Sequence, residues 1–134
     1  MHKSRLCYIT IDVNDMTEAL RFWTAALGAK RETIGDASAA IYQRITLPDQ
    51  PLRILLQLVP EKKTAKTRMH LDIETDNVPA EVARLVKLGA KVQRPVDERG
   101  FQFSVMEDPF GNEFCVLQTE YPELLKEAPT WPND

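Results

Sequence analysis

The chain has 134 residues, enough to bury one hydrophobic core and too few for two independent domains, so we expect residues 1–134 to form a single domain. No segment approaches the roughly twenty consecutive apolar residues that span a bilayer, and the formal net charge of −3 lacks the broad positive field that binding to nucleic acid requires. Composition therefore excludes a membrane anchor and nucleic acid from the expected partners.

The N-terminus and the cysteines predict a cytoplasmic protein. The chain begins without the apolar stretch and small-residue cleavage site of a secretory signal. Cys7 and Cys115 are the two cysteines and have no CxxC spacing, so neither a disulfide framework nor a thiolate zinc site is expected. We interpret both as reduced thiols of the core.

The first predicted elements are a strand over 8–13 and a helix over 16–27. The strand alternates apolar Ile9, Ile11 and Val13 with polar Tyr8, Thr10 and Asp12. Asp15 is a predicted N-cap of the helix and forms a capping box with Glu18, and Gly28 is a predicted left-handed end. The strand therefore has one face for a core and one polar face.

The same pattern returns in the second half of the chain. Residues 70–75 alternate again, Asn77 is a predicted cap, and an apolar helical stripe runs to Gly89. The helices end alike, with Ala-Leu-Gly-Ala-Lys at 26–30 and Lys-Leu-Gly-Ala-Lys at 87–91. This repetition indicates an internal duplication of one β-α-β-rich unit.

Further strand-like segments complete each copy, at 38–47, 52–59, 91–96, 101–107 and 113–118. We expect a first module over 5–60, a polar linker over 61–68, a second module over 69–118 and a C-terminal tail over 119–134. Three prolines preclude one long helix in the tail, and a short helical turn is expected over 123–127. Trp131 either packs on its own chain or contacts a partner.

Polar residues occupy matching positions in the two leading strands. Tyr8, Thr10 and Asp12 correspond to His70, Asp72 and Glu74. A single polar sheet face is often simply solvated, whereas two related polar faces predict a shared cleft. Glu113 starts a largely apolar strand, where a carboxylate is costly to bury unless it is paired or binds a cation.

These stretches together resemble a known superfamily. Arg-Met-His-Leu-Asp-Ile-Glu at 68–74, Leu-Gly-Ala-Lys-Val at 88–92 and Asp-Pro-Phe-Gly-Asn-Glu-Phe-Cys at 108–115 look like the second half of a glyoxalase-like domain, and Ile-Thr-Ile-Asp-Val-Asn-Asp with Ala-Leu-Arg-Phe-Trp and Ala-Leu-Gly resembles its first half. The resemblance covers roughly residues 5–118 and implies the α+β vicinal oxygen chelate fold of glyoxalase I, bleomycin resistance proteins and extradiol dioxygenases. Two βαβββ modules then form one curved mixed sheet with a cleft.

In metal-binding members of this superfamily, the resemblance implies ligands at the positions of Tyr8, Gln57, His70 and Glu113. His70 and Glu113 match the family's usual metal ligands. Gln57 is a possible further ligand, because it aligns less closely with the family's position on that strand. Tyr8 departs from the family pattern, because a neutral phenol with an ordinary pKa near 10 is a poor ligand for a divalent ion. An extradiol dioxygenase, which needs two histidines and a carboxylate for iron(II), is therefore disfavoured.

Three functions remain open at this point. One is a metal-free small-molecule binder that uses Tyr8, Gln57, His70 and Glu113. Another is a lyase or isomerase of the glyoxalase type, in which His70 and Glu113 hold a zinc, nickel, manganese or iron ion and a carboxylate such as Glu113 or Asp72 moves the proton. The third is a domain with an interaction role. Family habit and open sheet edges also predict a homodimer.

Overall fold

The computed structural model of the protein describes residues 1–32, 37–48, 50–65 and 67–133. Position 66 of the predicted linker and position 134 of the tail therefore lie outside the described residues. The chain divides into two compact units: Cys7–His70, here the first module, and Leu71–Asp134 with Met1–Leu6, here the second module. Each module is described by itself.

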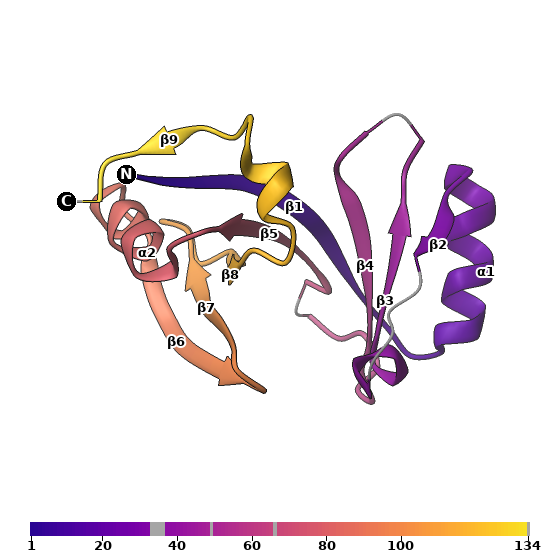
Figure 1. The fold of residues 1–134 in the computed structure, drawn as a ribbon. Helices are drawn as coiled ribbons and strands as arrows, with labels where there is room; N and C mark the ends of the chain where they lie inside the picture. Colours follow the sequence, from indigo (N-terminus) through magenta and orange to yellow (C-terminus); the bar gives the residue numbers. More distant parts are fainter. Residues whose placement is uncertain (33–36, 49, 66, 134) are drawn as a thin grey trace. The chain divides into compact units, whose positions relative to one another are not determined.

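The first module is a sheet packed with a helix, α1 (Figure 1). It contains β1 (His2–Val13) from Cys7 onward, α1 (Met16–Leu27), β2 (Lys30–Glu32), the 3-10 turn η1 (Ala37–Ala40), β3 (Tyr42–Thr46) and β4 (Arg53–Leu58). Its strand order is β2-β3-β4-β1, in which β1 pairs parallel to β4 and the other pairs are antiparallel. This is the predicted βαβββ arrangement.

Local sequence sets both ends of α1. The Asp15 side chain accepts a hydrogen bond from the Glu18 backbone N–H at 3.0 Å, which satisfies one of the unpaired donors of the first turn. Gly28 ends the helix in the left-handed conformation, with a φ of 62° that side chains with a Cβ avoid. The Glu18 carboxylate forms an ion pair with Arg21 along the helix. This pair takes the place of the hydrogen bond to Asp15 that a capping box would have.

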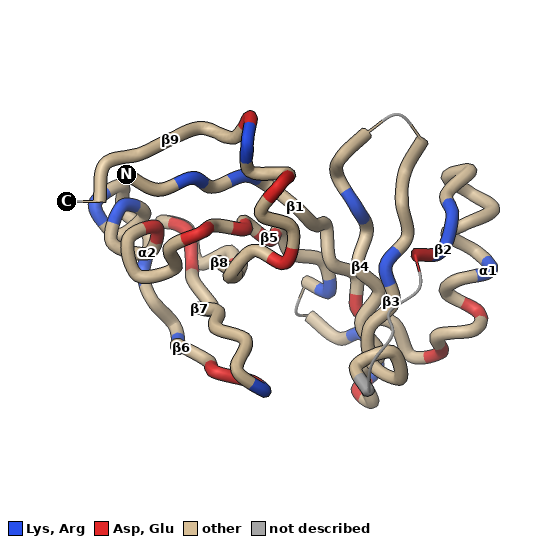
Figure 2. The backbone as a smooth tube through the Cα atoms, in the orientation of Figure 1, with Lys and Arg blue, Asp and Glu red and all other residues tan. Residues whose placement is uncertain are grey.

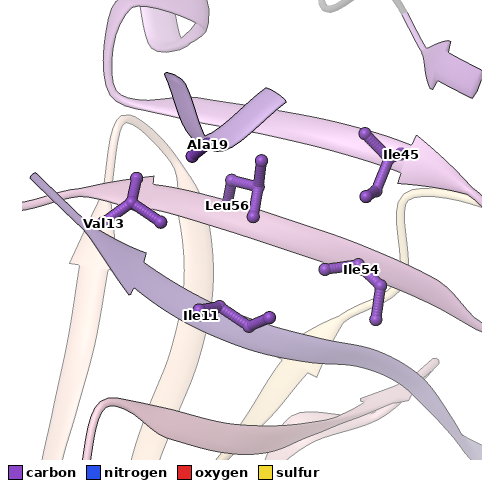
Figure 3. Close-up of a cluster of buried hydrophobic side chains, with 6 residues drawn as sticks. All are labelled: Ile11, Val13, Ala19, Ile45, Ile54 and Leu56. Carbon is purple, nitrogen blue, oxygen red and sulfur yellow. The ribbon is translucent and has the colours of Figure 1, made fainter. Parts of the chain in front are cut away.

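The core of the first module lies between α1 and one face of the sheet. Figure 3 shows six of its buried side chains, which come from β1, α1, β3 and β4: Ile11, Val13, Ala19, Ile45, Ile54 and Leu56. Ile45 and Leu56 are completely buried. The alternation that predicted an apolar face on 8–13 is thus confirmed by Ile11 and Val13.

The second module repeats the arrangement. It contains β5 (Met69–Thr75) from Leu71 onward, α2 (Val78–Lys87), β6 (Lys91–Glu98), β7 (Phe101–Glu107) and β8 (Glu113–Gln118), in the strand order β5-β8-β7-β6. The β5–β8 pair is parallel, and the other two pairs are antiparallel. Asn77 caps α2 by accepting from the Ala80 backbone N–H at 3.1 Å. Val78, Met106 and Val116 form its buried core. The predicted fold class, α+β with two βαβββ modules, is confirmed.

Two predictions of secondary structure need correction in the first half. The strand predicted over 8–13 begins six residues earlier, at His2, and the segment 38–47 divides into η1 and the shorter strand β3. In the early part of β1 the buried residues are the polar His2 and Ser4. Hydrophobic alternation therefore gave no signal there.

The tail packs against the start of β1. The 3-10 turn η2 (Pro122–Leu125) is the expected short helical turn, and β9 (Thr130–Trp131) pairs antiparallel with His2 and Lys3. The Trp131 indole N–H donates to Ser4 Oγ at 3.0 Å, and the Arg84 guanidinium lies 4.0 Å from the centre of the indole ring. Of the two interpretations of Trp131, packing on its own chain is confirmed. Within the described ranges, no helix has the length and apolar character needed to cross a membrane.

Candidate functional site

The first module has a polar sheet face opposite its core. Tyr8 pairs with Arg53, Asp12 with Gln57 and Tyr42 with Gln57, and register partners on neighbouring strands project to the same side. Tyr8 and Thr10 are only 5% and 1% exposed, so this end of the face is covered by protein. Simple solvation does not account for its polar residues.

Two arginines carry positive charge on this face. Arg44 Nη1 donates to the Tyr8 hydroxyl oxygen at 3.2 Å, and Arg53 Nε donates to Glu32 Oε2 at 2.8 Å. Arg44 Nε lies 4.0 Å from the same carboxylate oxygen. Figure 2 shows basic residues on β3 and β4 and an acidic residue on β2. Two guanidinium groups thus share one carboxylate, which leaves this group of three side chains with a net positive charge.

The contact with Arg44 bears on metal binding by Tyr8. A cation already donates a hydrogen bond to the phenol oxygen, the atom that a metal ion would have to approach. A second cation there would be repelled by the guanidinium at short range. The residues present at this position do not fit a metal ion. Tyr8 already differs from the metal ligand that the family resemblance implies at this position, and the neighbouring guanidinium makes metal binding there still less favourable.

The second module also has a polar face opposite its helix. Asp72 pairs with Cys115, while Ile73 pairs with Val116 of the buried core. Glu113 and Cys115 thus lie on the side away from α2, as their alternation with Phe114 and Val116 predicted. The division between the modules falls within β5, just after His70.

Three potential metal-ligating atoms come together on β5 and β8. The ligand atoms of His70, Asp72 and Cys115 all lie within 4.8 Å of one another. Asp72 is 2% exposed, whereas His70 and Cys115 are half-buried. Cys115 is therefore part of the polar face, and its interpretation as a core thiol needs correction; Cys7 is buried, as expected.

Glu113 lies outside this group of three. Glu113 is the first residue of β8, and the pairing of β5 with β8 begins one residue later, at Leu71 and Phe114. The Glu113 carboxylate, however, accepts from the side-chain amide of Gln93 at 3.5 Å. Among the described residues, the compact set of donors around His70 thus includes Asp72 and Cys115, and Glu113 is its neighbour in the sheet.

The carboxylate of Glu74 has a structural partner. It accepts from Arg5 Nε at 2.5 Å, and both side chains are largely buried. Such an ion pair in a protected environment fixes the start of β1 against β5. Of the polar side chains on β5, Asp72 and His70 are therefore the better candidates for chemistry.

Sequence patterns did not clearly indicate a buried hydrogen-bonded contact of the second module, between His2 and Glu81. His2 Nε2 lies 2.6 Å from Glu81 Oε2, and both side chains are fully buried. Burial alone raises the pKa of Glu81, but hydrogen bonds from Arg84 and His2 outweigh it and hold this pKa below its ordinary value. The signal in the sequence was Glu81 itself, three residues after Val78 on the apolar stripe of α2.

An apolar groove lies elsewhere on the second module. It has a volume of about 470 Å³ and is formed by α2, β6 and β7, with Val78, Val82, Val92 and Val96 among its lining residues. Asp97 is its one ionisable lining residue. The groove therefore offers a mainly apolar surface on the second module.

Comparisons with known proteins identify the family of this chain and its structural neighbours. A family model described as a glyoxalase-like domain matches residues 8–117, and a comparison with curated proteins gave no match. A hypothetical protein, BH1468 from Bacillus halodurans C-125, is 17% identical with a TM-score of 0.64, over 87% of this chain and 95% of that one. Methylmalonyl-CoA epimerase from Mycobacterium tuberculosis is 15% identical with a TM-score of 0.63, over 89% of each chain.

A further solved structure is a variant of Streptomyces coelicolor methylmalonyl-CoA epimerase in complex with 2-nitronate-propionyl-CoA. It is 16% identical, with a TM-score of 0.64 over 88% of this chain and 99% of that one. At such identities the neighbours show the fold alone. The family model covers most of the chain, and the chain therefore belongs to the glyoxalase-like domain family, with the vicinal oxygen chelate fold.

Proposed function

We propose that this glyoxalase-like domain binds a small molecule that carries a carboxylate or another oxyanion, on the polar face of its first module. The hydrogen bond from Arg44 to Tyr8 carries the proposal, because it places a guanidinium and a phenol side by side in a protected position. Guanidinium groups bind carboxylates through two parallel hydrogen bonds. Gln57, on the same face, adds an amide that can orient the ligand.

The charge on this face supports an anionic ligand. Arg44 and Arg53 both lie within ion-pair distance of Glu32, so two guanidinium groups gather around one carboxylate. The Arg44 side chain is only 11% exposed, and a charge in such surroundings is weakly screened and interacts strongly with an anion. The same proposal assigns His70 and Glu113, at the two positions named by the family resemblance, as further ligand-contacting residues.

A ligand screen tests this proposal. Thermal shift and calorimetry with acetate, malonate, pyruvate and methylmalonyl-CoA sample carboxylates of increasing size, and the last is the ligand named for one structural neighbour. Arg44→Gln should weaken a bound carboxylate about 10- to 100-fold, because hydrogen bonds to charged groups contribute about 1.5–3 kcal/mol. Tyr8→Phe should weaken it about 2- to 10-fold, as expected for a neutral hydrogen bond.

Arg31→Gln is the matched control. Arg31 is an arginine of the same small sheet, but it pairs with Ile45 on the core side and donates to Gln43 at 3.0 Å. Its replacement should leave ligand affinity unchanged. Equal affinity of the Arg44→Gln and wild-type proteins for every carboxylate, with both folded, would contradict the proposed site.

The second candidate function is a lyase or isomerase of the glyoxalase type. His70 and Glu113 would hold a zinc, nickel, manganese or iron ion, with Gln57 as a further ligand. The observation in its favour is that β5 and β8 place His70 and Glu113 on adjacent strands. When bound, such an ion would polarise a carbonyl oxygen of the substrate. Glu113 or Asp72 would move the proton.

Metal content decides this candidate. Elemental analysis of untagged protein, after dialysis against each ion in turn, should give about one ion per chain or per dimer, and His70→Ala should remove it. Unchanged metal content in His70→Ala would exclude His70 as a ligand.

We also propose a homodimer in the cytoplasm. Among the described residues of its module, β6 pairs with β7 alone and so forms an open edge, although Pro95 and the irregular register between Val92 and Arg94 reduce its capacity for further pairing. Both cysteines are free, as expected in a reducing compartment. Light scattering should give twice the chain mass, and a monomer at high concentration would refute the dimer.

A further inference from the structure

The apolar groove of the second module is separate from the proposed anion site. It lies between α2 and the β6–β7 hairpin, all of its lining residues belong to one module, and its volume is about 470 Å³. Pockets that hold small organic molecules measure about 300–1,000 Å³. The anion site uses residues of the first module. The groove is therefore large enough for a ligand of its own.

Strand register gives the groove a polar end. In the hairpin, Pro95 pairs with Ser104 and Asp97 pairs with Gln102, and all four residues line the groove. Ser104 in turn pairs with Val116, which belongs to the core that packs on α2. Register partners project to the same side of a sheet, and so do residues two apart on one strand. Asp97 and Gln102 therefore lie on the α2 side, toward the loop of the hairpin.

Aliphatic side chains form most of the remaining wall. Val78 and Val82 come from α2, and Val92 and Val96 come from β6. Val92 is 45% exposed, so apolar surface of the groove is in contact with water. A hydrocarbon that covers such surface gains from the hydrophobic effect. The groove therefore favours a ligand with an apolar body.

A carboxylate sets the charge of the groove. Asp97 is the ionisable residue among the described residues that line it. The basic residues of β6 belong to other parts of the sheet: Lys91 pairs with Glu107 and Arg94 with Val105, and neither basic residue lines the groove. A cationic group is therefore the electrostatic complement of the polar end.

The first turn of α2 offers little to an anionic ligand. Unpaired N–H groups at the start of a helix attract anions. Here Pro79 has no backbone N–H, and the backbone N–H groups of Ala80 and Glu81 both donate to Asn77, at 3.1 and 3.0 Å. The helix end that lines the groove therefore does not compete with Asp97 in setting the charge of the ligand.

We propose that this groove binds an apolar amine. The hydrocarbon body packs on Val82, Val92 and Val96, and the ammonium group donates to the Asp97 carboxylate. The Gln102 side-chain oxygen can accept a further hydrogen bond from the same ammonium group. The volume fits a small molecule. Because the first module gathers guanidinium groups and this groove presents a carboxylate, the two sites take ligands of opposite charge.

The experiment compares three probes with one carbon skeleton: 4-phenylbutylamine, 4-phenylbutanol and 4-phenylbutyrate. Shifts of the backbone amide signals in proton–nitrogen NMR spectra measure the affinity and locate each probe. The amine should shift signals of β6 and β7 and should bind there about 2- to 5-fold more tightly than the alcohol, as expected for an ion pair at an exposed carboxylate. The butyrate should bind the groove most weakly.

Charge reversal at the polar end gives the sharpest test. Asp97→Lys should reverse the preference, so that 4-phenylbutyrate binds the groove more tightly than the amine. Glu98→Lys is the matched control, because Glu98 is the next residue of β6, is also exposed and does not line the groove. It should keep the preference for the amine. Both changes fall on exposed positions, where substitutions seldom disturb folding.

Three results would overturn the amine site. One is equal binding of the amine and the alcohol by the wild-type protein, and another is an unchanged preference in Asp97→Lys. The third is a groove whose amide signals shift on dilution of the protein and do not respond to the amine, which would assign it to contact between copies of the chain. None of these results bears on the anion site, because its amide signals come from the first module.

Discussion

The two helices carry the same pair of residues in very different surroundings. Each has a glutamate in its first turn and an arginine three residues later, Glu18–Arg21 in α1 and Glu81–Arg84 in α2. Glu18 and Arg21 are 62% and 67% exposed, whereas Glu81 is fully buried and Arg84 is 23% exposed. Sequence spacing sets which side chains can pair on a helix. Burial decides whether the pair matters for stability.

The comparison extends to the polar faces of the two modules. On the first module, Arg44 and Arg53 share the polar face with Tyr8, whereas on the second module Asp72 and Cys115 are register partners on the polar face. Both modules keep the same strand order and helix position. A duplicated fold thus preserves the geometry of its faces, while their chemistry diverges.

The largest effect is expected from the buried member of the helical pairs. Glu81→Ala should lower the free energy of unfolding by about 3–5 kcal/mol, because it leaves the buried His2 and the Arg84 guanidinium without their shared carboxylate. Glu18→Ala is the matched control and should leave stability unchanged within experimental error, since its pair is exposed. Urea denaturation measures both. Similar losses in the two variants would invalidate the comparison.

The two cores should respond alike. Leu56→Ala in the first module and Met106→Ala in the second each remove a fully buried side chain, and each should cost about 2–5 kcal/mol. Leu88→Ala, at a position 68% exposed, should change stability by less than about 0.5 kcal/mol. Denaturation followed by circular dichroism checks all three. A loss confined to one module's variant would show that the modules differ in packing.

Acid should destabilise the second module through Glu81. The pKa of Glu81 is lower in the folded protein than its ordinary value of 4.5. The stability it contributes is therefore fully present above pH 4.5 and is lost as the pH falls through the depressed value. His2 and Arg84 face this carboxylate, and Glu81→Gln should flatten the decline in that range. An identical acid profile for Glu81→Gln and the wild type would assign the decline to other carboxylates.

The smallest effect is expected where the tail meets β1. Trp131→Leu removes the hydrogen bond to Ser4 and the contact with Arg84, and should cost about 1–2 kcal/mol. Limited proteolysis of the tail, together with thermal unfolding, measures it. A tail as resistant as in the wild type would show that β9 pairing alone fixes this segment.

Much of the fold was predictable because local rules and global packing agree. The caps Asp15 and Asn77, the glycine that ends α1, and the strands over 101–107 and 113–118 all appear where the sequence placed them. The three-residue strand β2 was missed, since Lys-Arg-Glu has no apolar alternation. Strand pairing with β3, rather than its own pattern, makes it a strand.

The sequence predicted on which sheet face each candidate residue lies, but it did not predict which side chains these residues contact. The sequence by itself determined the duplication, the two polar faces and the presence of Tyr8, His70, Asp72 and Glu113 on them, because side-chain direction follows strand parity. Only the tertiary structure decided that Arg44 donates to Tyr8 and that Cys115 lies beside Asp72. Those contacts depend on which strands become neighbours and in what register, and residues more than thirty positions apart leave no local signal of that choice.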